Sequence, residues 1–251
     1  MPFVRKLVLI RFIPTSPLLP KPIFRITYAI MKPDNSPDCI LWDMDGTLID
    51  QTDSIVRCYH QVLQSQGVEL PSPSAIKRSL GGPLRHTLAL FLPKDQVEAA
   101  ATEFIERFPA YMFEGMRVLE GALELIEELH QRGIDQAILT NKQGKNARAV
   151  STHCGFDRFI NVCLGNGDTP YEKPDPKFTE LALRALVGNF SQIVLIGDSP
   201  TDVATAQNYQ IDCYGIATGS HSQEELSQAG ATQTFPHLPA LREYWGMHWG
   251  L

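Results

Sequence analysis

The sequence predicts an α/β fold, a doubly wound parallel sheet with a helical domain inserted after its first strand, and three observations support this. From Asp38 onward, short apolar runs alternate with helical patterns, which is typical of a parallel sheet covered by helices on both faces. Between the first two predicted strands, residues 53–117 show helical patterns and no convincing strand. The 251 residues are 43% hydrophobic, which is enough to bury a substantial core.

Five short apolar runs are the predicted strands: 39–42, 136–139, 193–196, 212–216 and 232–235. Two segments between these runs place apolar residues on one helical face. Residues 120–132 put Leu123, Ile126 and Leu129 on the same side, and residues 176–185 repeat apolar residues at helical spacing. We expect both helices to pack against the sheet.

Residues 53–117 are predicted to form a separate small domain. Their apolar residues recur at helical spacing up to Leu63, the run Gly81-Gly82-Pro83 interrupts the pattern, and residues 88–111 resume it. The expected organisation is therefore a core made of residues 38–52 and 118–251, into which a helical cap domain of residues 53–117 is inserted.

Residues 1–30 differ in composition from the rest of the chain. They carry five bases and no acid, which leaves a net charge of −11 for residues 31–251. A secretory signal is disfavoured because Arg11 cuts the apolar run short, and a transit peptide is disfavoured because serine is scarce. We expect residues 1–30 to be a disordered extension or to lie upstream of a true start at Met31, outside the fold.

Composition excludes several classes of protein. The net charge of −6 argues against binding of duplex nucleic acid, which requires a basic surface. No apolar run approaches the roughly 20 residues of a membrane-spanning helix. The five cysteines are odd in number and never spaced as CxxC, so neither a disulfide framework nor a zinc site is indicated. We expect a cytoplasmic protein, either a monomer or a homodimer.

Polar residues directly follow three of the predicted strands. These residues are Asp43-Met44-Asp45-Gly46 after the first strand, Thr140-Asn141 after the second, and Asp198 with Asp202 after the third. Each group alone has an ordinary explanation as a turn or a helix cap. Because ligands bind at the carboxyl ends of the strands in open α/β sheets, the three groups are instead expected to converge on one site.

The predicted cluster of carboxylates indicates phosphoryl-transfer chemistry. Crowded carboxylates repel one another, and Mg²⁺, which prefers oxygen ligands and substrate phosphates, would relieve this repulsion. One Asp can accept the phosphoryl group as an acyl phosphate, and a second Asp two residues further on can protonate the leaving alkoxide. A calcium-binding loop at Asp43 is excluded, because the later ligand positions of an EF-hand are not matched.

Four motifs, in this order, make the chain resemble the haloacid dehalogenase (HAD) superfamily: Asp43-Met44-Asp45-Gly46-Thr47-Leu48, Thr140-Asn141, Lys173-Pro174-Asp175-Pro176 and Gly197-Asp198-Ser199-Pro200-Thr201-Asp202. The resemblance spans about residues 38–245. It is strongest to the phosphoglycolate phosphatase group, whose helical cap follows the first motif and whose core is Rossmann-like.

The resemblance implies a role for each of these residues. It implies that Asp43 is the nucleophile and a magnesium ligand, and that Asp45 is the general acid/base and offers its backbone carbonyl to the metal. Asp198 would be the direct carboxylate ligand of the fourth motif, and Asp202 would bind the metal directly or through water. Thr140 and Asn141 would bind phosphate, and Lys173 would pair with the nucleophile and the transferred phosphoryl group.

The lysine and the substrate are less sharply defined by the sequence. Lys142, Lys145 and Lys177 lie near Lys173, which is favoured because the following proline biases it toward an extended loop conformation. The break at Gly82 and Arg85 could present Arg85 to a carboxylate or second phosphate of the substrate, or could be a plain turn with a solvated arginine.

Three functions agree with these motifs. The favoured one is a Mg²⁺-dependent phosphatase for a small phosphorylated metabolite, with 2-phosphoglycolate as the best single candidate. The alternatives are a sugar-phosphate mutase of the β-phosphoglucomutase kind and a non-catalytic relative that serves as a binding module. The complete set of acidic residues together with Lys173 argues against the last.

Overall fold

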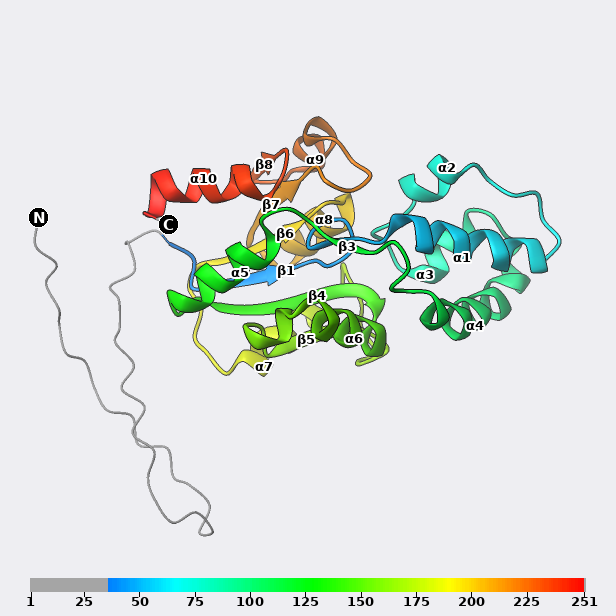
Figure 1. Ribbon diagram of the computed structural model, residues 1–251, viewed down its shortest axis with the longest axis horizontal. Coiled ribbons are helices and arrows are strands. Elements are labelled where there is room, and N and C mark those ends of the chain that lie inside the picture. Colours follow the sequence, from blue (N-terminus) through cyan, green and yellow to red (C-terminus); the bar gives the residue numbers. More distant parts are fainter. Residues whose placement is uncertain (1–35, 251) are drawn as a thin grey trace, which may run out of the picture.

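The computed structural model describes residues 36–250, so the prediction for residues 1–30 lies outside the described part of the chain. Within it, a parallel six-stranded sheet has the order β5-β4-β1-β6-β7-β8 (Figure 1). Its strands are β1 (Cys39–Trp42), β4 (Asp135–Gln143), β5 (Val162–Asn166), β6 (Ile193–Gly197), β7 (Asp212–Ile216) and β8 (Gln233–Phe235). The predicted α/β fold with a doubly wound parallel sheet is confirmed.

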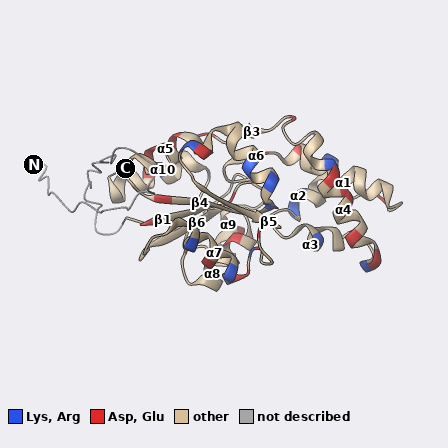
Figure 2. Ribbon diagram, turned by 90° about the horizontal axis from the view of Figure 1, so that it is seen from below, with Lys and Arg blue, Asp and Glu red and all other residues tan. Residues whose placement is uncertain are grey.

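Helices cover both faces of this sheet, and Figure 2 shows α5 and α6 on one side and α7 and α8 on the other. The first face holds α5 (Ala122–Gln131), α6 (Gly144–Cys154) and α10 (Leu238–Trp249), and the second holds α7 (Pro176–Leu186), α8 (Pro200–Tyr209) and α9 (Gln223–Ala229). Along β1, Ile40 and Trp42 pack into the first core and Leu41 into the second. This alternation follows from the two-residue repeat of a strand and explains why β1 is apolar throughout.

A helical segment leaves the sheet after β1 and returns before α5. Its two ends form a short antiparallel pair, β2 (Ile49–Asp50) and β3 (Arg117–Val118). Between them lie α1 (Thr52–Ser65), α2 (Pro73–Arg78), α3 (Leu84–Ala89) and α4 (Val97–Arg107), which share an apolar core of their own. We call residues 52–110 the helical insert.

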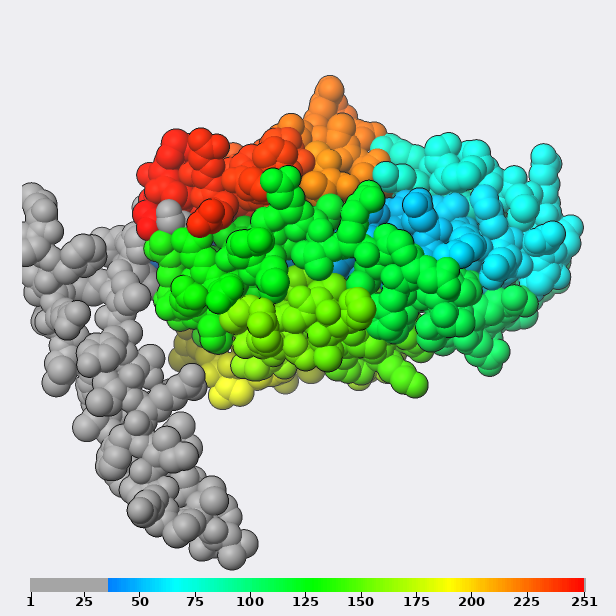
Figure 3. Space-filling view, viewed as in Figure 1, coloured from blue at the N-terminus to red at the C-terminus, as the bar shows by residue number. Residues whose placement is uncertain are grey.

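The helical insert contacts the end of the sheet at which the strands terminate. The Arg78 guanidinium, at the end of α2, forms an ion pair with Glu225 on α9 at 2.5 Å and donates to the Ser220 carbonyl at 2.6 Å. Figure 3 shows the corresponding cyan and orange surfaces in contact. The Asn141 amide also donates to the carbonyl of Gly81, in the loop between α2 and α3, at 3.2 Å.

Two features of the sheet were not expected from the sequence. β5 was not predicted because it is a half-buried edge strand that ends in Gly165-Asn166, residues that are rare in strands. β4 extends four residues beyond the predicted end at Leu139, because Gln143 regains a partner in β5 after a shift in register. Thr140 and Asn141 therefore lie within the last part of β4 rather than beyond it.

None of the helices in residues 36–250 is long and apolar enough to cross a membrane. All five cysteines fall within the described residues and are free thiols.

Candidate active site

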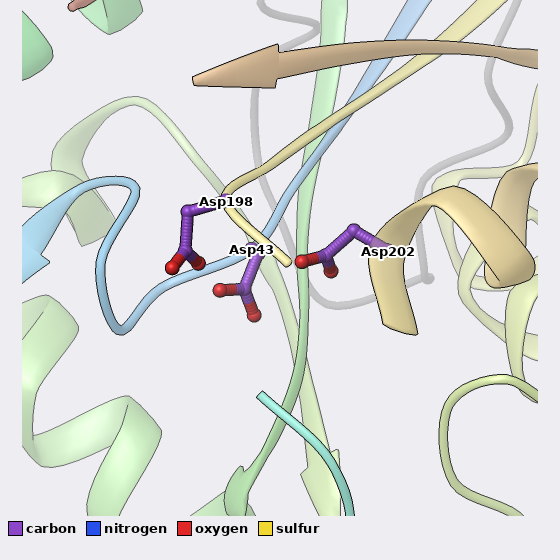
Figure 4. Close-up of side chains that lie close together, drawn as sticks. All are labelled: Asp43, Asp198 and Asp202. Carbon is purple, nitrogen blue, oxygen red and sulfur yellow. The ribbon is translucent and has the colours of Figure 1, made fainter. Parts of the chain in front are cut away.

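The acidic residues that follow two of the predicted strands lie close together at one edge of the sheet. Asp43 follows β1, Asp198 follows β6, and Asp202 lies in the first turn of α8, as Figure 4 shows. One carboxylate oxygen from each lies within 4.8 Å of the other two, and all three residues are buried. The backbone N–H of Asp43 donates to the Ile196 carbonyl at 2.8 Å, which fixes the end of β1 against β6.

Lys173 is the lysine that lies within this cluster. Its Nζ donates to Oδ1 of Asp43 and to Oδ1 of Asp202, both at 2.6 Å, and its side chain is 1% exposed. The side chain of Asn141 holds the backbone of Lys173 from both directions, accepting from its N–H at 2.8 Å and donating to its carbonyl at 3.1 Å. Asn141 therefore positions Lys173, and its side-chain amide is engaged by protein groups.

Asp202 serves the helix and the cluster at the same time. Its Oδ2 accepts from the Ser199 N–H at 3.1 Å and the Ser199 hydroxyl at 2.7 Å at the start of α8, and its Oδ1 accepts from Lys173. Asp202 therefore caps α8 and also contacts the buried lysine. Because both oxygens have protein partners, Asp202 is better placed to orient Lys173 than to be a direct cation ligand.

Asp198 is confined by two glycines, Gly46 of the first motif and Gly219, which no sequence pattern connected to it. A Cβ atom built on Gly46 would lie 2.5 Å from Oδ2 of Asp198, and one on Gly219, in the loop after β7, would lie 1.6 Å from it. The Thr218 hydroxyl donates to the Gly46 carbonyl at 2.6 Å and joins the two loops. The position of Gly219 just after a strand was the only indication in the sequence that it lies near the site. The loop contains no Asp, Glu, Lys or Arg that would have marked it as a candidate.

Burial and charge repulsion set the electrostatics of the cluster. Burial raises the pKa of Asp43 to about 7; Lys173 opposes this rise, and Asp202 and Asp45 add to it. Burial, followed by repulsion from Asp43 and Asp202, raises the pKa of Asp198 well above its usual range. Although burial alone lowers the pKa of Lys173, attraction by Asp202 and Asp43 outweighs it and raises that pKa.

The donor set fits a hard divalent cation. It consists of carboxylate oxygens, which Mg²⁺ and Ca²⁺ prefer over softer ligands. Three carboxylates face one ammonium group, so a cation would supply the missing positive charge. Asp43 and Asp198 are the residues that would hold it, with the Asp45 backbone carbonyl as a third candidate.

Asp45 lies beside the cluster and is paired with a different lysine. Its carboxylate accepts from Nζ of Lys142 at 3.0 and 3.1 Å, while Lys142 is almost fully buried. Lys142 also donates to the Gln51 side chain, and its Nζ lies 4.9 Å from the centre of the Phe108 ring. Lys142 had no predicted role, although its place two residues after Thr140 at the end of β4 was a signal for one.

The remaining predicted residues line one cavity beside the cluster. Thr140 is buried there, and its hydroxyl accepts from the Lys142 N–H at 3.2 Å. Gly82 lines the cavity from the loop between α2 and α3. Arg85 also lines it, but its Nε donates to Glu98 of the insert at 2.8 and 3.0 Å. The prediction that Arg85 meets the substrate stays a prediction, and the arginine is already paired.

The raised pKa of Asp43 predicts a pH-dependent stability for the cation-free protein. The carboxyl ionises near 3.8 when unfolded and near 7 when folded, so its ionisation destabilises the folded state increasingly as pH rises from about 4 to 7. Asp43→Asn removes this penalty. Relative to the parent, we expect its free energy of unfolding to rise by on the order of 2 kcal/mol between pH 5 and pH 8 in EDTA.

Urea unfolding followed by circular dichroism at the two pH values measures this difference. The same substitution at an exposed carboxylate, Asp95→Asn, is the control measured alongside it. A pH-independent difference for Asp43→Asn would contradict the raised pKa.

A second prediction concerns Gly219. In Gly219→Ala the added methyl group must displace the Asp198 carboxylate, because it would otherwise lie 1.6 Å from Oδ2, far inside van der Waals distance. We expect the affinity for Mg²⁺, measured by calorimetry, to fall at least tenfold, with an unchanged circular dichroism spectrum. Unchanged affinity in a folded Gly219→Ala variant would mean that Asp198 takes no part in holding the cation.

Comparisons with known proteins identify the family of this chain. Residues 40–216 match the family model described as haloacid dehalogenase-like hydrolase. The chain is 29% identical to a phosphoglycolate phosphatase of Rhodospirillum rubrum over 84% of this chain and 91% of that protein. It is also 29% identical to a 5'-nucleotidase of Pseudomonas aeruginosa over 83% of this chain and 96% of that protein.

A solved structure supports the fold. A haloacid dehalogenase-like family hydrolase from Streptococcus pneumoniae superposes with a TM-score of 0.75 at 22% identity, over 83% of this chain and 98% of that one. The family model covers more than half of the chain, including the first strand with its acidic motif and the strand that precedes Asp198. The chain therefore belongs to the haloacid dehalogenase-like hydrolases.

Proposed function

We propose that this protein is a Mg²⁺-dependent phosphoric monoester hydrolase that acts through an aspartyl-phosphate intermediate on Asp43. The observation that carries the proposal is the buried contact of 2.6 Å between Nζ of Lys173 and Asp43, within a carboxylate cluster that borders a cavity. A bound Mg²⁺ would supply positive charge to the phosphoryl oxygens. The remaining chemistry is assigned to side chains of this chain.

In the first step, a carboxylate oxygen of Asp43 attacks phosphorus and the bond to the leaving oxygen breaks. Asp45 gives a proton to the departing alkoxide, and Lys173 stabilises negative charge on the phosphoryl oxygens. In the second step, Asp45 takes a proton from water, which attacks phosphorus and releases phosphate from Asp43. Thr140 at the end of β4 is the proposed hydrogen-bond donor to the phosphoryl group.

The first substrate to test is 2-phosphoglycolate, because the Rhodospirillum rubrum relative is a phosphoglycolate phosphatase. A 5'-nucleotide is the second candidate, because the Pseudomonas aeruginosa relative is equally similar and is a 5'-nucleotidase. The five free thiols support the proposal of a reducing, cytoplasmic location. The mutase alternative uses the same motifs and differs in the fate of the phosphoryl group.

The nucleophile assignment predicts that Asp43→Asn abolishes turnover, because the isosteric amide cannot attack phosphorus. Phosphate release from 2-phosphoglycolate, sugar phosphates and nucleoside monophosphates, with Mg²⁺ and with EDTA, measures this. We expect release by the parent with Mg²⁺ and none with EDTA or with the variant. Parental activity in Asp43→Asn would refute the assignment, and isomer formation from a hexose 1-phosphate without phosphate release would favour the mutase.

The role of Asp45 predicts a smaller effect. Asp45→Asn should lower kcat by roughly 10²–10⁴-fold, the usual contribution of general acid–base catalysis. In kcat/KM, which reports the first step alone, the loss should be smaller for an aryl phosphate such as 4-nitrophenyl phosphate, whose leaving group needs no proton. An equal loss for alkyl and aryl esters would argue against proton donation by Asp45.

A further inference from the structure

The cavity beside the carboxylate cluster has two chemically different sides. On the sheet side it is bordered by the acidic residues and by Thr140, Asn141 and Lys142. On the side of the helical insert, it is bordered by apolar side chains. These are Leu80 and Leu84 on either side of the glycine loop, and Phe104, Ile105 and Phe108 at the end of α4 and just after it. We call these five residues the apolar wall.

The apolar wall is incompletely covered by the protein itself. Leu80, Leu84, Phe104 and Ile105 are each half-buried, whereas Leu88 and Ala100 in the interior of the insert are fully buried. Leu80, Leu84 and Phe104 pack on the core of the insert with one side and line the cavity with the other. Covering this surface with an apolar group would contribute roughly 25 cal/mol for each Å² removed from water.

The charged residues on the insert side do not offset this apolar character. Arg85 of the insert is held by Glu98, and on the sheet side of the cavity Lys142 is held by Asp45 and Gln51. Lys77 is exposed on α2 at the edge of the cavity. The insert side of the cavity, which the leaving group of a substrate bound at Asp43 would meet, is therefore lined mainly by leucine, isoleucine and phenylalanine.

We infer that the preferred substrate is a phosphomonoester whose leaving alcohol carries an apolar or aromatic body, which packs against the apolar wall. The inference rests on the proposed function and narrows its substrate class. A two-carbon acid such as glycolate offers no apolar group to cover the wall, and a small polyol would place hydroxyl groups against it without partners. An aromatic ring covers it and can stack on phenylalanine.

Matched esters test this inference. Benzyl phosphate and ethyl phosphate both release primary alcohols of similar acidity and differ in the apolar body. We expect kcat/KM for benzyl phosphate to exceed that for ethyl phosphate and for 2-phosphoglycolate at least tenfold, since even one methylene in an apolar pocket is worth about 10-fold or more. Equal values, or a preference for 2-phosphoglycolate, would overturn the inference while leaving the phosphatase intact.

A binding measurement separates this inference from the proposed function. Calorimetric titration of Asp43→Asn measures the affinity for each of the two esters without turnover. Benzyl phosphate should bind at least tenfold more tightly than ethyl phosphate. If neither ester is hydrolysed by the parent but this difference in binding is present, the proposed phosphatase function is contradicted, while the inferred preference for an apolar group is supported. Equal binding of the two esters would overturn the inference that the apolar wall binds the leaving group.

Two leucines of the insert provide a matched pair of variants. Leu84 begins α3 and lines the cavity, whereas Leu90, just after the end of α3, is 57% exposed and is not among the cavity-lining residues. Leu84→Ala should lower the benzyl-to-ethyl ratio of kcat/KM at least fivefold, and Leu90→Ala should leave it unchanged. If Leu84→Ala does not fold, Ile105→Ala serves the same purpose, and an unchanged ratio in a folded cavity variant contradicts the inference.

Discussion

The arrangement of the candidate site depends on one buried ammonium group. Lys173 lies between Asp43 and Asp202, with 2.6 Å to each carboxylate, in a position where an unpaired charge would cost several kcal/mol. Asn141 fixes the backbone of Lys173, and Ser199 fixes the other oxygen of Asp202. Four separate segments of the chain are thus joined through one residue, by its side chain and its backbone. Lys142, one of the competing lysines nearby in the sequence, pairs with Asp45 instead.

The same cluster has more negative than positive charge. Repulsion among the carboxylates and their burial raise the pKa of Asp43 and of Asp198, which is a sign that the protein alone does not satisfy these groups. Such imbalance is typical of sites that bind cations or transfer charge, since a purely structural cluster would have been neutralised. The glycines at positions 46 and 219 leave room for the Asp198 carboxylate and keep other side chains out of this space.

The helical insert contributes the other half of the cavity. It contacts the sheet edge through Arg78 and Glu225 and through the bond between Asn141 and the Gly81 carbonyl. The second contact links the acidic end of the cavity to the glycine loop, so this loop is positioned by the residue that also holds Lys173. The acidic cluster and the apolar wall therefore lie on different parts of the fold, and Asn141 is hydrogen-bonded both to Lys173 in the cluster and to Gly81 in the glycine loop.

Sequence patterns alone were sufficient to predict the α/β architecture and to place Asp43, Thr140 and Asp198 at one edge of the sheet. They were sufficient because strand periodicity is local and the carboxyl ends of parallel strands meet at one edge. Lys173 was also favoured by the sequence, but only the folded chain reveals that Lys142 pairs with Asp45, that Arg85 is held by Glu98, and that Gly219 touches Asp198. These contacts join residues on separate segments, and their geometry depends on how helices and loops pack, which no local pattern of residues encodes.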